Sequence, residues 1–222
     1  HITTGMPFVI LKVAMTLDGK IATESGDSKW ITSLASRRYV HRLRSRVDAV
    51  LTAIGTVKAD DPQLTVRLIK GRNPVRVVID PEFEIPLTAN LLKTPPPTII
   101  FTKNKAHSPL PEGVEVEYFD SERLDLGDAM KRLYQRGITS VLIEGGSSLN
   151  YYALKDGIVD KVLFFIAPKI MGGKNSIPSV GGISPGLDYA WRIKDLKTRK
   201  IGEDFLVEGY VESSSLRPEF SS

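Results

Sequence analysis

Two adjacent carboxylates, Asp60 and Asp61, precede a proline, and Arg67 follows five residues after that proline. The pattern comes after an apolar run over 49–54 and a glycine, Gly55, that is expected to form a turn. A surface turn needs only one Asp or Asn. A carboxylate and a guanidinium held beside the end of a strand could bind a polar or anionic ligand. The alternative is a capped turn with a surface arginine, and other segments must decide between the two.

A lysine stands inside the first predicted strand. The apolar run over 8–15 predicts a buried strand, and the alternation of side chains places Lys12 and Ala14 on the same face. Burying an ammonium group is costly unless it is paired or used in the function. The alternative is a lysine at the edge of a sheet, with its stem buried and its charge in solvent.

Another acidic residue, Glu144, follows the apolar run over 141–143 and precedes Gly145 and Gly146. Paired glycines let the backbone approach a ligand closely, and a helix predicted over about 148–155 would offer free N–H groups to a phosphate. The segment is neither a G-x-G-x-x-G motif nor a P-loop, and glycines also occur in ordinary strand-to-helix turns. Because open α/β sheets bind ligands at the C-terminal ends of their strands, Glu144 is a candidate for the site.

A tryptophan, Trp30, lies in a loop rich in glycine and serine over 26–33. Exposing a tryptophan is costly, so we expect its side chain either to pack beneath the loop or to cover a flat ligand. In the helix predicted over 34–47, Arg44 borders the apolar stripe, where a guanidinium suits a phosphate. The other arginines of that helix are expected to face solvent.

The composition excludes several classes of function. The chain has 222 residues, no cysteine and three histidines without metal-ligand spacing, so a thiolate zinc site, a cysteine nucleophile and a required metal are not expected. We interpret His41 and His107 as structural or solvated. The net charge of +4 comes from basic residues interleaved with acidic ones, which favours an anionic small molecule over nucleic acid. No apolar run approaches the roughly 20 residues of a membrane helix, and a cytoplasmic protein is expected.

These candidate residues need a sheet to bring them together. Further strands are predicted over 48–54, 75–80, 98–102, 115–119 and 159–167, with a helix between Asp125 and Gly137. Strands that alternate with helices predict an α/β sheet covered by helices on both faces. The segments 193–199 and 204–211 predict an antiparallel C-terminal hairpin, which makes the sheet mixed. The polar tail over 213–222 is expected to be disordered.

Taken together, these segments resemble the reductase domain of the bifunctional riboflavin-biosynthesis deaminase–reductase. The motifs that carry the resemblance are Phe8–Lys12, Leu17–Lys20, Ser25–Ser33, Arg44, Thr56, Ala59–Pro62, Leu64–Arg67, Glu144–Gly146 and Ala167–Lys169. They stand in the family's order and extend from residue 7 to about 211. Residues 1–6 resemble a linker from a preceding deaminase domain, and residues 7–212 resemble the reductase domain. The His-x-Glu and Pro-Cys-x-x-Cys zinc signature of the deaminase is absent from this sequence.

The resemblance implies a dihydrofolate-reductase-like three-layer α/β fold with a mixed, mostly parallel sheet, NADPH as reductant and a homodimer. It implies reduction of a phosphorylated pyrimidine, 5-amino-6-ribosylaminouracil 5′-phosphate, whose opened ribosyl chain accepts hydride at C1′. Archaeal and fungal relatives reduce the 2,5-diamino-pyrimidinone before deamination, and the linker-like start favours the bacterial type of substrate. Lys103 and Lys105 are candidates for binding the 2′-phosphate of NADPH.

The resemblance also implies roles for individual residues. Substrate contacts are implied for Ser28, Arg44, Leu64, Arg67 and Glu144. Cofactor contacts are implied for Ala14, Trp30, Thr56, Asp60, Gly145, Gly146, Ser147, Ser148, Leu149, Asn150, Tyr151 and Tyr152. The catalytic candidates are Lys12, Asp60 and Glu144, which could handle protons or place charge, and the sequence does not decide among them. We expect the two carboxylates to share one pocket with Lys12.

Two other functions are compatible with parts of the pattern. A folate-type reductase of the same fold would place a carboxylate against a pterin and need no phosphate site, which Arg44 and Arg67 argue against. A nucleotide- or sugar-phosphate-binding module would need the paired glycines but not Lys12, Asp60 and Trp30 around one pocket.

Overall fold

The computed structural model describes residues 4–93, 95–106, 109–184 and 186–212. The strands are β1 (Phe8–Thr16), β2 (Lys20–Ala22), β3 (Ala49–Ala53), β4 (Val75–Ile79), β5 (Thr98–Thr102), β6 (Val114–Tyr118), β7 (Ser140–Ile143), β8 (Lys161–Ala167), β9 (Ile177–Pro178), β10 (Ile193–Ile201) and β11 (Asp204–Val211). The helices are α1 (Leu34–Arg44), α2 (Ile54–Asp60), α3 (Leu126–Gln135) and α4 (Ser147–Lys155), with short 3-10 turns η1 (Asn90–Leu92) and η2 (Leu187–Tyr189). The predicted tail over 213–222, residues 1–3 of the linker-like segment and His107 lie outside the described residues.

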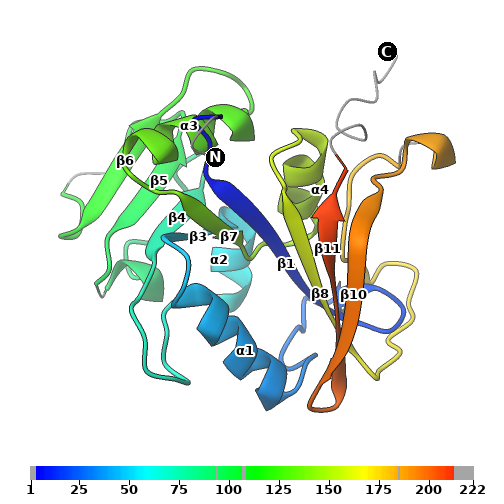
Figure 1. Ribbon diagram of the computed structural model, residues 1–222. Helices are drawn as coiled ribbons and strands as arrows, with labels where there is room; N and C mark the ends of the chain where they lie inside the picture. The colour runs from blue at the N-terminus through cyan, green and yellow to red at the C-terminus, as the bar shows by residue number, and fades with distance from the viewer. Residues whose placement is uncertain (1–3, 94, 107–108, 185, 213–222) are drawn as a thin grey trace.

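The main sheet has nine strands in the order β10-β11-β8-β1-β7-β3-β4-β5-β6. All neighbours from β8 to β6 are parallel, whereas β11 is antiparallel to both β8 and β10. Figure 1 shows this sheet twisting through the molecule, with β10 and β11 at one side and β6 at the other. The predicted mixed, mostly parallel sheet with an antiparallel C-terminal hairpin is confirmed.

Helices cover both faces of the sheet, as alternation along β1 requires. Val9, Leu11 and Val13 are buried in the core cluster that contains the inner residues of α3 and α4. Ile10 and Ala14 instead pack on the opposite face, in the cluster that contains Val40 of α1. The same opposite face is covered further along by α2, whose Val57 packs with Val78 and Ile100. Lys12 lies between Ile10 and Ala14 in this alternation and therefore faces the α1 side.

The end of α1 differs from the prediction. The helix ends at Arg44 rather than Val47, because Ser45 is the C-cap and the backbone N–H groups of Arg46 and Val47 both donate to the carbonyl of Leu43. Val47 is buried and keeps the apolar periodicity of the helix, although it already belongs to the turn into β3. Arg44 is consequently in the last helical turn and not in the middle of a longer helix.

The segment after β3 was predicted wrongly. The expected turn at Gly55 is instead the start of α2, so Asp60 stands at the end of a helix and not at a strand-to-turn junction. The N-cap residue Ala53 makes no side-chain hydrogen bond, and glycine is a poor helix former, so the usual signals of a helix start are missing. Asp61, with a φ of 42°, ends α2 in the left-handed region.

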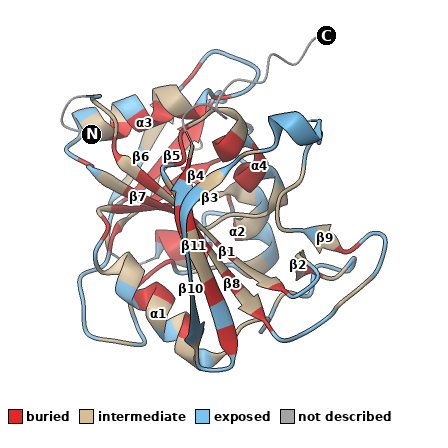
Figure 2. Cartoon of the chain, turned by 45° about the vertical axis from the view of Figure 1, so that its right-hand side comes forward, coloured by how far each residue is buried: buried red, intermediate tan, exposed pale blue. Residues whose placement is uncertain are grey.

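Burial of the residues decreases from the central strands of the sheet toward the edge formed by β10. Figure 2 shows buried residues along the central strands, whereas β10 is almost wholly exposed. Within the described part of the chain, no helix combines the length and the apolar character that crossing a membrane would require. The predicted start of α3 is confirmed, since the Asp125 side chain accepts hydrogen bonds from the N–H groups of Gly127 and Asp128.

Candidate active site

Two neighbouring strands bring a lysine and a glutamate together. Leu11 of β1 lies opposite Ile143 of β7, so the next residues, Lys12 and Glu144, are side by side at the end of β7. The Lys12 Nζ is 3.3 Å from the Glu144 Oε2, and the two side chains are 16% and 8% exposed. The alternative of a sheet-edge lysine is wrong, because β1 is paired with β7 on one side and β8 on the other.

Arg44 completes this cluster from the last turn of α1. Its Nε is 2.5 Å from Glu144 Oε1 and its Nη2 is 3.1 Å from Glu144 Oε2, a two-pronged ion pair. Burial raises the pKa of Glu144, but the charges and hydrogen bonds of Arg44 and Lys12 outweigh burial and lower that pKa to about 2. Glu144 is therefore ionised at neutral pH, and its charge is held between two cations.

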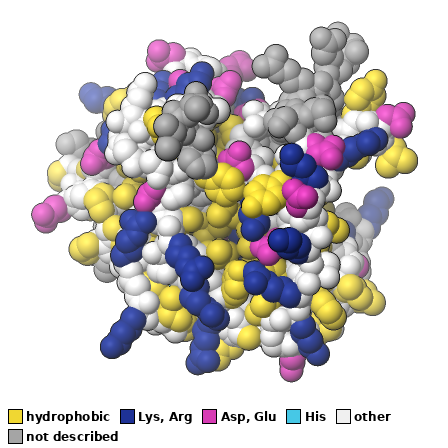
Figure 3. All heavy atoms as spheres, viewed as in Figure 1, with side chains coloured by type: hydrophobic (Ala, Val, Ile, Leu, Met, Phe, Trp, Pro, Cys, Tyr) yellow, Lys and Arg dark blue, Asp and Glu magenta, His cyan; other side chains and the backbone are white. Residues whose placement is uncertain are grey.

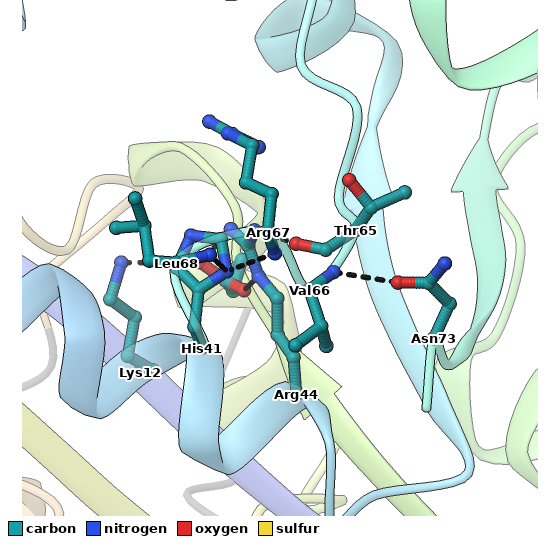
Figure 4. A network of polar contacts seen from close by, with 9 residues as sticks. Lys12, His41, Arg44, Thr65, Val66, Arg67, Leu68 and Asn73 are labelled. Carbon is teal, nitrogen blue, oxygen red and sulfur yellow. Dashed lines mark hydrogen bonds and ion pairs between the residues drawn. The ribbon is translucent and has the colours of Figure 1, made fainter. Parts of the chain in front are cut away.

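Arg67 lies beside this cluster on the loop after α2. Its guanidinium makes no ion pair among the residues that the structure describes, and Figure 4 shows it extending away from His41 and Arg44. Partial burial and the positive charge of Arg44 lower the pKa of Arg67, against an opposing effect of Glu144, although Arg67 is exposed at the surface. Lys12, Arg44 and Arg67 are three cations against Glu144 alone, and this excess of positive charge suits a phosphate.

The resemblance implies a substrate contact for Leu64, at the start of the same loop, but the side chain of Leu64 lies in the core. Its side chain is 3% exposed and packs with Val47, Val50 and Leu142 in the core. Its φ of 53° is in the left-handed region, which turns the chain toward Arg67. A substrate could therefore meet only the backbone of Leu64.

Asp60 belongs to a different set of contacts. The Ser28 Oγ donates to Asp60 Oδ1 at 3.0 Å. Lys29 Nζ is 3.5 Å from the same oxygen and donates to the Asp60 carbonyl at 3.1 Å. The side chains of Lys29 and Asp60 are 51% and 31% exposed. The structure thus joins Lys12 to Glu144 and Asp60 to Ser28, and the single pocket for both carboxylates stays a prediction.

A hollow of about 200 Å³ lies beside Ser28. Its walls are residues 27–31 and 169–171, with Thr16 and Thr23. Trp30 in this wall is 56% exposed, and the Arg37 guanidinium lies 4.0 Å from the centre of its ring. Packing of Trp30 beneath the loop is therefore wrong, whereas covering a flat ligand stays a prediction.

The walls of the hollow are held by hydrogen bonds of Lys169 and Asp18. Lys169 Nζ donates to the Trp30 carbonyl at 2.8 Å. Asp18 accepts hydrogen bonds from the backbone N–H groups of Met171 and Gly172 and from the Thr16 hydroxyl, and these bonds lower the pKa of Asp18. Both sides of the hollow are thus anchored to the ends of β1 and β8.

The start of α4 has the features that suit a phosphate. Gly146 is its N-cap and provides no side-chain capping bond, so the first N–H groups of the helix are available. A Cβ atom on Gly145 would lie 2.5 Å from the Leu149 side chain, so only glycine fits there. The first turn of α2 is close by, since a Cβ atom on Gly146 would lie 3.7 Å from Thr56 Oγ1.

The implied cofactor residues of α4 do not all present side chains to this turn. Leu149, Asn150 and Tyr151 are buried: Leu149 packs in the core, and Asn150 Nδ2 donates to the Ser179 carbonyl at 2.8 Å. Ser148 is exposed and Tyr152 is 37% exposed. The Ser147 Oγ is buried without a hydrogen-bond partner in the described structure. The implied cofactor residue Ala14 is half-buried on the same face of β1 as Lys12.

Other candidates for phosphate contacts lie after β5. Lys103 Nζ is 2.7 Å from Glu82 Oε1, so its charge is already paired, whereas Lys105 is exposed. Figure 3 shows lysine and arginine side chains gathered over the lower half of this face, where Figure 1 places α1 and β10. Part of this basic surface thus lies over α1, the helix that carries Arg44.

Sequence reasoning gave no individual role to Lys29 and Lys169 and no specific contact to His41. Lys29 pairs with Asp60, Lys169 holds the Trp30 loop, and His41 bonds to the backbone of the Arg67 loop. The interpretation of His41 as structural is confirmed, because it is buried and bonds to the loop backbone. Lys29 and Lys169 lie in the motifs Ser25–Ser33 and Ala167–Lys169, which signalled the region but not the contact. Among the described residues, no group of three or more His, Asp or Glu side chains is placed to hold a metal.

Comparison with known proteins identifies relatives along almost the whole chain. Residues 7–207 match the family described as RibD C-terminal domain. The chain is 41% identical over 225 residues to the riboflavin biosynthesis protein RibD of Actinobacillus pleuropneumoniae, covering 97% of this chain and 60% of that protein. It is also 41% identical over 216 residues to the 2,5-diamino-6-ribosylamino-4(3H)-pyrimidinone 5′-phosphate reductase of Methanothermobacter thermautotrophicus, covering 93% of this chain and 99% of that protein.

A solved structure agrees. The deaminase and 5-amino-6-(5-phosphoribosylamino)uracil reductase of Thermotoga maritima superimposes with a TM-score of 0.82 and 36% identity, covering 95% of this chain and 58% of that one. The expected dihydrofolate-reductase-like fold is confirmed. The chain spans 60% and 58% of the length of two curated RibD relatives.

Proposed function

The chain belongs to the RibD C-terminal domain family, and from this premise we propose that it is an oxidoreductase of riboflavin biosynthesis. The proposed reaction reduces the ribosyl side chain of 5-amino-6-ribosylaminouracil 5′-phosphate to the ribitylamino product. The observation that carries the proposal is the charge arrangement, in which the half-buried Lys12 and Arg44 hold ionised Glu144 beside Arg67, which has no ion pair within the described part of the chain. A folate carries no phosphate that would need this excess of positive charge.

The residues of the chain support such a reduction by position and charge. A reduced nicotinamide would supply the hydride for C1′. Glu144 is ionised and cannot donate a proton, whereas the Lys12 ammonium at its side can donate one to the nitrogen that becomes the amine. We assign Arg67 to the substrate phosphate. Arg44 acts mainly through Glu144, since its guanidinium is already paired there.

NADPH is the proposed reductant, and its phosphates fit the N–H groups at the start of α4. Thr56 on α2 and the exposed Trp30 would line the same cofactor. Asp60 would contribute to this part of the site through Ser28. Lys105, which is exposed, is the better candidate for the 2′-phosphate, because Lys103 is paired with Glu82.

A second substrate is favoured by the similarity to the Methanothermobacter reductase, which acts on the 2,5-diamino-pyrimidinone phosphate according to its name. Both candidates carry the same ribosyl phosphate, so the cluster around Glu144 would serve either one. The two differ only in the pyrimidine ring, where one has an amino group and the other an oxygen.

The decisive experiment follows NADPH oxidation by absorbance with four additions in parallel: each ribosylamino phosphate, dihydrofolate, and buffer alone. The proposal expects oxidation with at least one phosphate substrate and none with dihydrofolate or buffer. Oxidation with dihydrofolate alone would establish the folate-type reductase, and tight binding without oxidation would establish a binding module.

Comparing kcat/KM for NADPH with kcat/KM for NADH tests the choice of cofactor, and equal values would contradict NADPH.

Partners and location follow from the same proposal. Relatives of greater length support an N-terminal zinc deaminase domain fused to this one in the parent protein.

A homodimer is proposed through β10, an outer strand of the sheet with an exposed Leu196, since strands at the edge of a sheet favour pairing with another chain. Light scattering would test the dimer, and a monomer at all concentrations would contradict it. A cytoplasmic location and residues 7–212 as the reductase domain complete the proposal.

A further inference from the structure

His41 occupies a buried position between α1 and the loop that carries Arg67. Its side chain is 4% exposed, and its Nδ1 accepts a hydrogen bond from the backbone N–H of Arg67 at 3.0 Å. The backbone N–H of Leu68 lies 3.5 Å from the same nitrogen. One ring nitrogen therefore serves two consecutive N–H groups, and this bond joins the helix to the loop (Figure 4).

The loop needs such support because it has little regular structure of its own. Arg44 Nη1 donates to the Thr65 carbonyl at 3.0 Å, and the Val66 N–H donates to Asn73 Oδ1 at 2.7 Å. Together with His41, these side chains bond to the backbone of four consecutive residues, 65–68. Of the three, His41 and Arg44 lie one helical turn apart on α1, so the same helix places both the Glu144 ion pair and the loop.

Only one chemical form of His41 can make this contact. A ring nitrogen accepts an N–H bond only when it carries no proton, so the hydrogen of the neutral ring must be on Nε2. Burial and the positive charges of Arg44, Arg67 and Arg37 lower the pKa of His41 to about 4, against a smaller opposing effect of Glu144. The neutral ring is therefore the form present at physiological pH.

We infer that His41 is a positioning residue that holds the backbone of Arg67 in place beside the Lys12–Arg44–Glu144 cluster. The role of Arg67 in binding phosphate rests on the proposed function, whereas the contact between His41 and the loop does not. His41 touches neither substrate nor cofactor in this assignment. It acts through the loop, and its loss should weaken substrate binding without changing the hydride-transfer step.

The matched variants are His41→Leu, which removes the acceptor, and His41→Asn, whose Oδ1 stands where Nδ1 stands in histidine. His41→Leu should raise KM for the phosphorylated substrate roughly tenfold, the effect of one lost hydrogen bond in a partly buried loop. It should change kcat and KM for NADPH less than about twofold, and His41→Asn should recover most of the loss. Val40→Ala on the same helix, a buried residue outside the loop contacts, controls for lost packing.

Amide hydrogen exchange tests the same contact without any substrate. The N–H groups of Arg67 and Leu68 should exchange roughly tenfold faster in His41→Leu than in the wild type, His41→Asn or Val40→Ala. Unchanged exchange in His41→Leu, or an equal KM increase in Val40→Ala, would overturn the inference. If the wild type reduces neither phosphate substrate, the proposed function fails while the exchange result still decides the role of His41.

A measurement on the wild type covers the case in which His41→Leu does not fold. Nitrogen NMR of the imidazole at neutral pH should show a protonated Nε2 and an unprotonated Nδ1. The opposite tautomer, or a doubly protonated ring, would overturn the inference regardless of the variants.

Discussion

The two clusters of charge around the candidate site are built in opposite ways. Lys12, Arg44 and Glu144 come from β1, α1 and the end of β7, and their side chains are 16%, 11% and 8% exposed. Asp60 and Lys29 come from a helix end and a loop, and their side chains are 31% and 51% exposed. Strand β1 and helix α1 carry two members of the first cluster, with Glu144 directly after β7, whereas in the second cluster Asp60 ends α2 and Lys29 lies in a loop.

The difference decides what each cluster can tolerate. Buried charges have no water to replace a lost partner, so every member depends on the others. Partly exposed charges can be solvated when a partner leaves, so they contribute little to stability. Changes in the buried cluster should therefore alter folding together with function, and changes in the exposed cluster should alter function alone.

The largest effect is expected for Glu144→Gln, which leaves Lys12 and Arg44 buried without their anion. Removing one partner of a buried pair costs about 3–5 kcal/mol, so the free energy of unfolding in urea should fall by that amount. The control is Glu84→Gln, whose ion pair with Lys58 is exposed at both ends and should contribute less than about 1 kcal/mol. Equal stability of both variants would remove the distinction between the clusters.

Acid should break the ion pairs of the buried cluster within a defined pH range. Because the folded-state pKa of Glu144 is about 2 against an ordinary 4.5, its stabilisation is fully present above pH 4.5 and is lost as pH falls toward 2. By linkage the loss amounts to at most about 3 kcal/mol. The stability difference between wild type and Glu144→Gln, measured by urea unfolding at several pH values, should shrink across this range. A difference that stays constant would show that Glu144 is not the titrating group.

Asp60→Asn is expected to slow the reaction while leaving the fold intact. Asparagine is nearly isosteric and can still accept the Ser28 hydrogen bond, but it carries no charge. Losing a group that handles a proton or places a charge should lower kcat about 100-fold. The free energy of unfolding should change by less than about 1 kcal/mol. Asp61→Asn, whose side chain accepts from the backbone of Asn90, is the neighbouring control and should retain near-normal kcat. A fully active Asp60→Asn enzyme would leave the exposed cluster with a structural role only.

Arg67→Ala sharpens the comparison, because Arg67 is exposed yet adjoins the buried cluster. A lost charge-assisted phosphate contact should cost about 1.5–3 kcal/mol, or roughly 10- to 150-fold in substrate affinity. Binding of NADPH, measured by fluorescence titration, should hardly change. The control is Arg72→Ala, which removes an ion pair between the exposed Arg72 and Asp48 and should change neither substrate affinity nor NADPH affinity. An equal loss of NADPH and substrate affinity would reassign Arg67 to the cofactor.

The sequence predicts the regular elements well because their signals are local. The strands over 98–102 and 204–211 agree with the structure to the residue. Alternation along β1 placed Lys12 on the correct face, and the apolar run before Glu144 placed it at the end of a strand. Each of these predictions depends on neighbours a few residues away.

Contacts between distant segments could not be predicted in the same way. Nothing in the sequence around Arg44 shows that its guanidinium contacts Glu144, because this ion pair depends on how α1 packs across the sheet. The helix α2 was missed because it has neither a capping side chain nor a good helix former at its second position. The exposed Trp30 resting on Arg37 was missed because loop conformation decides it.

The place of β1 in the sheet has a consequence for how the chain acquires its structure. Leu11 pairs with Ile143 on one side and with Val162 on the other, so both partners of β1 emerge from the ribosome long after it. By contrast, β3, β4, β5 and β6 are consecutive neighbours and can pair as they appear. Pairings between distant segments form slowly, since a long loop must close first. A nascent chain halted before β7 would therefore leave an apolar strand without neighbours, and chaperones would be most needed during this interval.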